Sequence, residues 1–264
     1  MGAIELFTFA VIGIGTGILA GLVGVSGGLI LIPCLVFMFK LNGMPSVYLM
    51  QLAIGTSLAA MVFTSYSSMR SHDKKGGVDW KVVKLMGVGL VIGCIAGAFL
   101  GHLLPTVVLQ FFFGMFAVAL GIYLFNRKRV LEERSQLPKP HILNGFALGV
   151  GILSNILGIG GGSLTVPIFL GFRMPMKKAV ATSAATGFIV SVVGAISYLL
   201  LGLGQSFYPY TIGYIYLPAF VILSVTTFVA APYGAKWAYE VETKKLLRYF
   251  AVSLFVIGLV MMVK

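Results

Sequence analysis

Long apolar segments separated by short polar ones cover most of the chain. The apolar segments span approximately 4–24, 28–39, 46–69, 82–104, 106–126, 142–157, 162–172, 179–203, 212–235 and 246–263. An open sheet in lipid would leave backbone N–H and C=O groups without partners, so we predict that these segments are helices. The segments 28–39 and 162–172 would rise only about 18 Å as helices, against about 30 Å of hydrocarbon. These two are therefore too short to cross a membrane alone.

The composition excludes a large soluble catalytic domain. Of the 264 residues, 59% are hydrophobic and 10% are charged, whereas a soluble domain carries about 25% charged residues. A soluble fold of this length could not bury so much apolar surface, so lipid must cover the excess. We therefore predict an all-α integral membrane protein with many crossings.

The basic residues predict how the chain is oriented. The formal net charge of +12 does not indicate a nucleic-acid partner, because Lys and Arg gather in the cytoplasmic loops of membrane proteins. Here they gather at about 70–81, 127–141, 173–178 and 236–245, whereas the loop at 203–213 has no charged residue. The positive-inside rule therefore predicts that these four loops are cytoplasmic and that both termini lie outside.

The chain contains an internal repeat. A glycine cluster followed by a proline occurs at Gly24–Gly28 and again, 134 residues later, at Gly158–Gly162. An Ala-x-x-Thr-Ser element ends at Thr56-Ser57 and, 126 residues later, at Thr182-Ser183. Each half holds five apolar segments, an odd number, so the second half must enter the membrane from the opposite side. We predict an inverted-topology repeat, as in many secondary transporters, with a first repeat over 1–126, a cytoplasmic linker over 127–141 and a second repeat over 142–264.

The two glycine clusters predict a binding site for an anion. In each half the cluster separates a full-length segment from a short one, as in a broken or re-entrant helix pair, and glycine allows the backbone to turn sharply there. The short helix would then begin inside the membrane and present the partial positive charge of its N-terminus. Two such ends form an anion cradle near the midplane. The alternative is that these glycines only permit close helix packing.

Hydroxyl and amide side chains near the clusters extend the candidate site. The repeated Thr-Ser pairs could donate hydrogen bonds to an anion, or bond back to their own helices. Ser26 replaces a glycine within the first cluster, and Asn155 precedes the second. The candidate substrate-binding residues are Gly24, Ser26, Gly27, Gly28, Thr56, Ser57, Asn155, Gly158, Gly160, Gly161, Gly162, Thr182 and Ser183.

The other reactive side chains do not form a catalytic or metal site. The seven acidic residues all lie in predicted loops or at membrane edges, so no general acid or base lies inside the membrane. His102 stands near a predicted helix end, and His72 and His141 fall in predicted loops. Cys34 and Cys94 lie in apolar segments and are interpreted as buried thiols. We therefore predict no catalytic residue, no metal and no cofactor.

Taken with the Ala-x-x-Thr-Ser elements, the duplicated cluster-then-proline element resembles the TauE/SafE family of sulfite exporters, over essentially the whole chain. The resemblance implies export of sulfite, or of an organosulfonate such as sulfoacetate, across the bacterial cytoplasmic membrane. Ser26 departs from the all-glycine pattern, and Asn155 occupies the place that matches Gly21.

These observations predict a multi-pass transporter that exports a small sulfur oxyanion. Its partners are the substrate and the membrane lipid, and the oligomeric state stays open. Because no carboxylate, Lys or Arg lies at the centre of a predicted span, we expect no proton relay and predict electrogenic, potential-driven uniport. The alternatives are a membrane scaffold or assembly factor without transport and, less favoured, an integral membrane enzyme.

Overall fold

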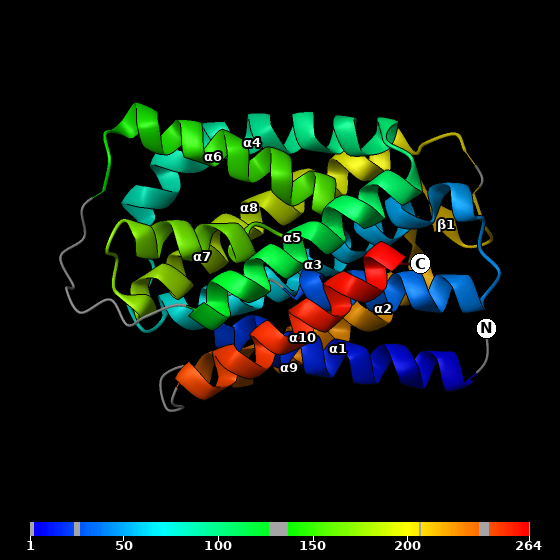
Figure 1. Ribbon diagram of the computed structural model, residues 1–264, viewed down its shortest axis with the longest axis horizontal. Helices are drawn as coiled ribbons and strands as arrows, with labels where there is room; N and C mark the ends of the chain where they lie inside the picture. The colour runs from blue at the N-terminus through cyan, green and yellow to red at the C-terminus, as the bar shows by residue number, and fades with distance from the viewer. Residues whose placement is uncertain (1–2, 24–26, 127–136, 206, 238–242, 264) are drawn as a thin grey trace.

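The computed structural model describes residues 3–23, 27–126, 137–205, 207–237 and 243–263. These residues form ten α-helices, one 3-10 turn and a short hairpin (Figure 1). The helices are α1 (Ala3–Val23), α2 (Gly28–Leu41), α3 (Leu49–Asp73), α4 (Trp80–Leu103), α5 (Thr106–Asn126), α6 (Pro140–Leu157), α7 (Gly162–Gly171), α8 (Met176–Leu201), α9 (Leu217–Trp237) and α10 (Thr243–Val263). The turn is η1 (Ser46–Tyr48), and the hairpin pairs β1 (Thr211–Ile212) with β2 (Ile215–Tyr216).

The all-α membrane fold predicted from the apolar segments is confirmed. Within the part of the chain that the structure describes, seven helices are long and apolar enough to cross a membrane, namely α1, α3, α4, α5, α6, α8 and α9. The segments predicted to be short are short: α2 has 14 residues and α7 has 10. At 1.5 Å per residue they rise about 21 Å and about 15 Å, less than the hydrocarbon thickness.

Two local predictions are corrected. The apolar segment at 212–235 does not begin as a helix, because Gly213 has φ of 55° in the turn of the antiparallel hairpin and α9 starts only at Leu217. His72 and His141 lie in helices rather than loops, in the last turn of α3 and the first turn of α6. His72 is buried, and its Nε2 lies 3.3 Å from the carbonyl oxygen of Gly21 in α1. This contact joins the last turn of α3 to α1.

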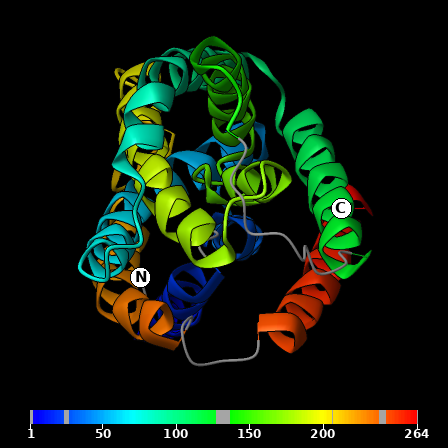
Figure 2. The same ribbon diagram turned by 90° about the vertical axis from the view of Figure 1, so that its left-hand side faces the viewer.

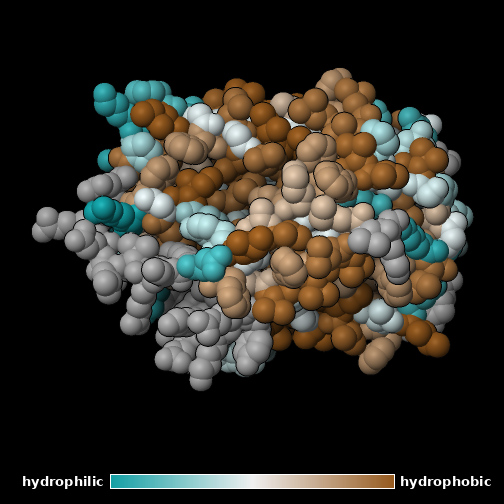
Figure 3. All heavy atoms as spheres, viewed as in Figure 1, coloured by the Kyte–Doolittle hydropathy of each residue, from teal (hydrophilic) through white to brown (hydrophobic). Residues whose placement is uncertain are grey.

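The ends of the helices separate the molecule into two faces (Figure 1). At the left of Figure 1, α3 ends and α4 begins, α7 ends and α8 begins, and α6 starts. We call this end the basic face, since Lys74, Lys139 and Arg173 lie there. The start of α1, the hairpin and the end of α10 lie at the other end, the opposite face. Figure 3 shows hydrophobic side chains over the middle of the molecule and hydrophilic ones mainly towards the two ends.

The helices pack as pairs around a central group. Helices α4 and α6 pack together, as do α1 with α9 and α5 with α10, while α3 packs against both α8 and α9. Seen end on, α7 lies in the middle, with the α4/α6, α1/α9 and α5/α10 pairs around it (Figure 2). Matching α1–α5 in order to α6–α10 reproduces these contacts: α1 with α9 corresponds to α6 with α4, and α3 with α9 corresponds to α8 with α4.

The predicted orientation can be tested with single cysteines on the two faces. We expect Lys74→Cys, on the basic face, to resist a membrane-impermeant maleimide added to intact cells, because the positive-inside rule keeps that face in the cytoplasm. Gln205→Cys, exposed on the opposite face, should react at once. Both reporters are made in a Cys34→Ser/Cys94→Ser background. Rapid labelling of Lys74→Cys in intact cells would refute the orientation.

Candidate functional site

The two glycine clusters meet in the interior of the protein. A methyl group on Gly28, at the start of α2, would lie 2.8 Å from the carbonyl oxygen of Gly158 and 3.0 Å from the Cα atom of Ile159. Any side chain at Gly28 would therefore push the two backbones apart. Gly27 packs in the same way against Thr16 of α1. Gly24 and Ser26, the other candidates of the first cluster, lie outside the described residues.

The second cluster turns the chain from α6 into α7. Gly158, Gly160 and Gly161 have φ of 67°, 52° and 66°, in the left-handed region that favours glycine. Gly158 closes α6, because its N–H donates to the carbonyl oxygen of Ser154. The carbonyl oxygen of Gly161 then accepts the N–H groups of Leu164 and Thr165, which begins α7. This glycine cluster therefore reverses the chain within four residues, as the sequence predicted.

The two short helices start near each other and run apart. From the glycine clusters, α2 leads to the opposite face and α7 to the basic face (Figure 1). The first N–H groups of any helix have no partner within that helix and carry partial positive charge. The structure thus brings Gly27, Gly28 and Gly158–Gly162 into one region at the N-terminal ends of both short helices.

The repeated threonines hold the starts of two other helices. The hydroxyl oxygen of Thr56 accepts the backbone N–H of Tyr216 at 2.9 Å, immediately before α9. The hydroxyl oxygen of Thr182 accepts the N–H of Asp79 at 3.1 Å, immediately before α4. Both threonines are fully buried. Their hydroxyls therefore have a structural role, and direct contact with an anion stays a prediction.

Removing the Thr182 acceptor is expected to destabilise the protein. Thr182→Val keeps the shape but leaves the partly buried Asp79 N–H without this partner, which costs about 1 kcal/mol, the lower end of the range for a buried donor. We expect a clear fall in melting temperature in detergent, and Thr182→Ser should restore most of it. Thr8→Val, which removes an exposed hydroxyl bonded only to its own helix, is the matched control. Equal melting temperatures for Thr182→Val and Thr8→Val would contradict this role.

A second pair of contacts also occupies corresponding positions. His72 and Tyr198 are 126 residues apart, and their partners Gly21 and Asn155 are 134 residues apart, the offsets of the sequence repeat. The Tyr198 hydroxyl donates to the carbonyl oxygen of Asn155 at 3.0 Å, while the His72 ring contacts the carbonyl oxygen of Gly21. Each half thus ties a long central helix to the end of the helix that precedes its glycine cluster.

Several buried hydroxyls around the clusters have no hydrogen-bond partner among the described residues. Native proteins pair most buried polar groups, so each unpaired one needs an explanation. Two belong to the repeated Thr-Ser pairs, and an unpaired amide oxygen belongs to the predicted Asn155. The unpaired atoms near the clusters are the hydroxyls of Ser57, Ser65, Ser68, Ser154, Ser163 and Ser183 and the Oδ1 atom of Asn155. Their lone pairs and protons are available to a water molecule or a polar ligand.

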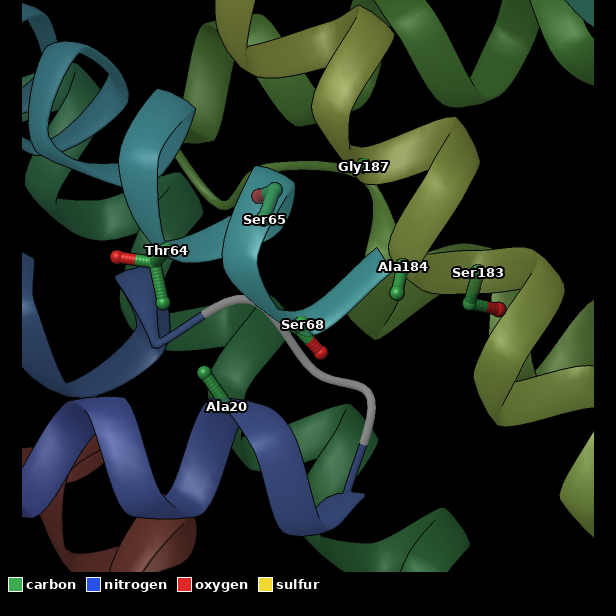
Figure 4. A pocket seen from close by; sticks show the side chains of 7 residues that line it. All are labelled: Ala20, Thr64, Ser65, Ser68, Ser183, Ala184 and Gly187. Carbon is green, nitrogen blue, oxygen red and sulfur yellow. The ribbon is translucent and has the colours of Figure 1, made fainter. Parts of the chain in front are cut away.

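Part of this polar set lines a small cavity between α1, α3 and α8 (Figure 4). Its volume is about 10 Å³, enough for about one water molecule. Of the predicted candidates, only Ser183 lines it. The remaining lining residues were not among the predicted site residues and are Ala20, Thr64, Ser65, Ser68, Ala184 and Gly187.

The sequence contained a signal for some of the cavity-lining residues that were not among the predicted site residues. Residues 64–68 read Thr-Ser-Tyr-Ser-Ser inside an otherwise apolar segment. Hydroxyl side chains in a membrane helix usually face other helices or a polar cavity. Ala20 and Gly187 give no such signal, because small residues also serve helix packing.

The buried polar groups of the site are neutral. Among the residues whose side chains the structure describes, no Lys, Arg, Asp or Glu is buried, and His72 is the one buried imidazole. Within the described residues, no group of three or more His, Cys, Asp or Glu could hold a metal ion. The arrangement therefore offers hydroxyls, an amide and helix N-termini to a ligand, without a fixed counter-charge in the described part.

Comparison with known proteins identifies the family. The family model described as "Sulfite exporter TauE/SafE" matches residues 9–261. The chain is 31% identical to a probable membrane transporter protein of Haemophilus influenzae, over 98% of this chain and 100% of that protein. It is also 31% identical to a probable membrane transporter protein of Methanocaldococcus jannaschii, over 96% and 93%, and 28% identical to YunE of Bacillus subtilis, over 94% of each. No solved structure matches. The chain therefore belongs to the TauE/SafE family of membrane transporters.

Proposed function

We propose that the protein exports a small sulfur oxyanion, sulfite or an organosulfonate such as sulfoacetate, from the cytoplasm of the cell. The observation that carries the proposal is the meeting of the two glycine clusters beside buried, unpaired hydroxyls, with no buried charge among the side chains that the structure describes. An oxyanion accepts hydrogen bonds at several oxygens, which neutral hydroxyls and helix N-termini can donate. The sulfur chemistry comes from the family description.

We further propose that the two halves, 1–126 and 142–264, form an inverted repeat joined by the linker 127–141. The proposal is supported by the corresponding helix contacts and by the corresponding bonds of Thr56 and Thr182. The basic face is then cytoplasmic, both termini lie outside, and the membrane is the bacterial cytoplasmic membrane. In this arrangement α2 and α7 are the two short helices whose N-termini meet near the midplane.

The size of the cavity limits what this conformation can hold. A space for about one water molecule is too small for an oxyanion with its first shell of contacts. Substrate entry would therefore require α3 and α8 to separate near Ser68 and Ser183, which line the cavity from α3 and α8 (Figure 4). This is the movement that alternating access around a central site requires.

Ligand-dependent stabilisation tests the substrate class. The purified protein is heated in detergent with sulfite, sulfate, thiosulfate, sulfoacetate or taurine at equal ionic strength. We expect sulfite or sulfoacetate to raise the melting temperature selectively, because a ligand at 100 times its Kd adds about 2.7 kcal/mol to the native state. Stabilisation only by sulfate, or equal responses to all five, would contradict the assigned substrate. A scaffold without transport would show neither selective stabilisation nor flux in liposomes.

We also propose that transport is electrogenic and needs no coupled ion. A site without a fixed positive charge binds an anion weakly enough to release it. The membrane potential, negative inside, then moves the anion outward.

A further inference from the structure

The two ends of the central α3/α8 crossing differ in the size of their side chains. In the repeat, residue 58 of α3 corresponds to residue 184 of α8, and residue 61 corresponds to residue 187, both at the offset of 126. Towards the basic face these positions hold Ala184 and Gly187, which line the cavity. Towards the opposite face they hold Leu58 and Met61, both fully buried. The space that stays open on one side of the crossing is thus occupied by side chains on the other.

Leu58 and Met61, which we call the barrier pair, pack against glycines. The Cδ1 atom of Leu58 would lie 3.0 Å from a methyl group on Gly194 of α8, where Asn155 also makes contact. The Cε atom of Met61 would lie 3.1 Å from a methyl group on Gly28, where the two glycine clusters meet. Leu58 therefore fills the space between α3 and α8, and Met61 fills the space between α3 and the start of α2, where the two glycine clusters meet.

Polar atoms lie beside the barrier pair without partners. Ser57 corresponds to Ser183 of the cavity, and Ser154 corresponds to Ala20, at the repeat offsets of 126 and 134. The hydroxyls of Ser57 and Ser154 and the Oδ1 atom of Asn155 are buried and unpaired among the described residues. A buried polar group without a partner is costly. Exposure of these three groups to water in another conformation would explain why they are present.

We propose that Leu58 and Met61 form the barrier that closes the transport path towards the opposite face, and that Ser57, Ser154 and Asn155 line the path when this barrier opens. The inference rests on the proposed transport function and deepens it, because Ser57 and Asn155 belong to the candidate site and Met61 packs against Gly28. It assigns unequal roles to equivalent positions of the two halves. On the side of Ala184 and Gly187 the crossing contains a cavity large enough for about one water molecule, whereas on the side of Leu58 and Met61 buried side chains fill the corresponding space.

The test measures access to a cysteine behind the barrier pair. Ser57→Cys is introduced in the Cys34→Ser/Cys94→Ser background, and a membrane-impermeant methanethiosulfonate is added from the opposite face. We expect slow labelling in this parent and labelling at least about tenfold faster with Leu58→Ala/Met61→Ala, because removing the packed side chains favours the open population. Met61→Leu, which conserves volume, should leave the cysteine protected. The single variant Leu58→Ala gives the same comparison if the double variant is not monodisperse.

A matched control distinguishes opening of the barrier pair from a general loss of packing in the protein. Leu109→Ala removes an equally buried leucine from α5, away from the α3/α8 crossing, and should leave the labelling rate of Ser57→Cys unchanged. Conversely, Gly187→Met should slow the labelling of Ser183→Cys from the basic face by about tenfold, because it recreates the barrier on that side. Equal acceleration by Leu109→Ala, or no acceleration by either barrier variant, would overturn the proposal. Labelling requires no sulfite, so the barrier assignment can hold or fail independently of the proposed substrate.

Discussion

Gly28→Leu is expected to abolish sulfite flux in proteoliposomes while the protein still inserts into the membrane. Even one methyl group at this position would lie 2.8 Å from the carbonyl oxygen of Gly158, and backbone atoms cannot move aside as flexible side chains do. A leucine would therefore separate the two glycine clusters and the helix N-termini that they position. Gly161→Leu should have the same effect, because it combines a φ of 66° with a clash against Val190.

The control for both variants is Gly149→Leu. Gly149 lies in α6, and a side chain there would meet open space, so this variant should keep its flux within about twofold of the parent. Size-exclusion chromatography in detergent checks that each variant is monodisperse. Full flux in monodisperse Gly28→Leu and Gly161→Leu would place the substrate path away from the glycine clusters.

Export is expected to follow the membrane potential. A potential of 100 mV is worth about 2.3 kcal/mol for each charge moved. For a dianion this is about 4.6 kcal/mol, which corresponds to a concentration ratio of more than about a thousandfold. Proteoliposomes are loaded with sulfite, and a potassium gradient with valinomycin sets the potential. Efflux should accelerate strongly when the side that corresponds to the cytoplasm is negative and the pH is equal on both sides.

His72 provides the sharpest control for ion coupling. It is the one buried imidazole among the described side chains, and it contacts the end of α1 that precedes the first glycine cluster. His72→Gln should leave the dependence of efflux on potential unchanged, because an amide can make a similar contact without carrying a proton. Efflux that ignores the potential but follows a proton gradient, and loses that response in His72→Gln, would refute uniport.

The sequence by itself determined the class of fold and the place of the chain reversals. In lipid, helices provide hydrogen-bond partners for the backbone N–H and C=O groups of ten apolar segments with so few charges. The structure has ten helices in the described residues. The glycine clusters beside two short segments predicted sharp reversals, and three positive φ angles at 158–161 confirm one of them. These features depend on composition and on local backbone geometry, which neighbouring residues largely specify.

Only the tertiary structure decided which side chains face each other. Thr56 and Thr182 hold the starts of α9 and α4, a role that the repeated Thr-Ser elements did not predict, since a hydroxyl bonds to whatever group the packing brings within reach; their contact with an anion stays a prediction. Ser65 and Ser68 line the cavity although they were not among the predicted site residues. Met61 and Gly187 occupy equivalent positions of the repeat but differ in side-chain size. This difference points to a barrier only because the structure places the two positions on opposite sides of the α3/α8 crossing. A sequence repeat shows which positions correspond, and the packing of α3 against α8 decides which of them is filled and which is open.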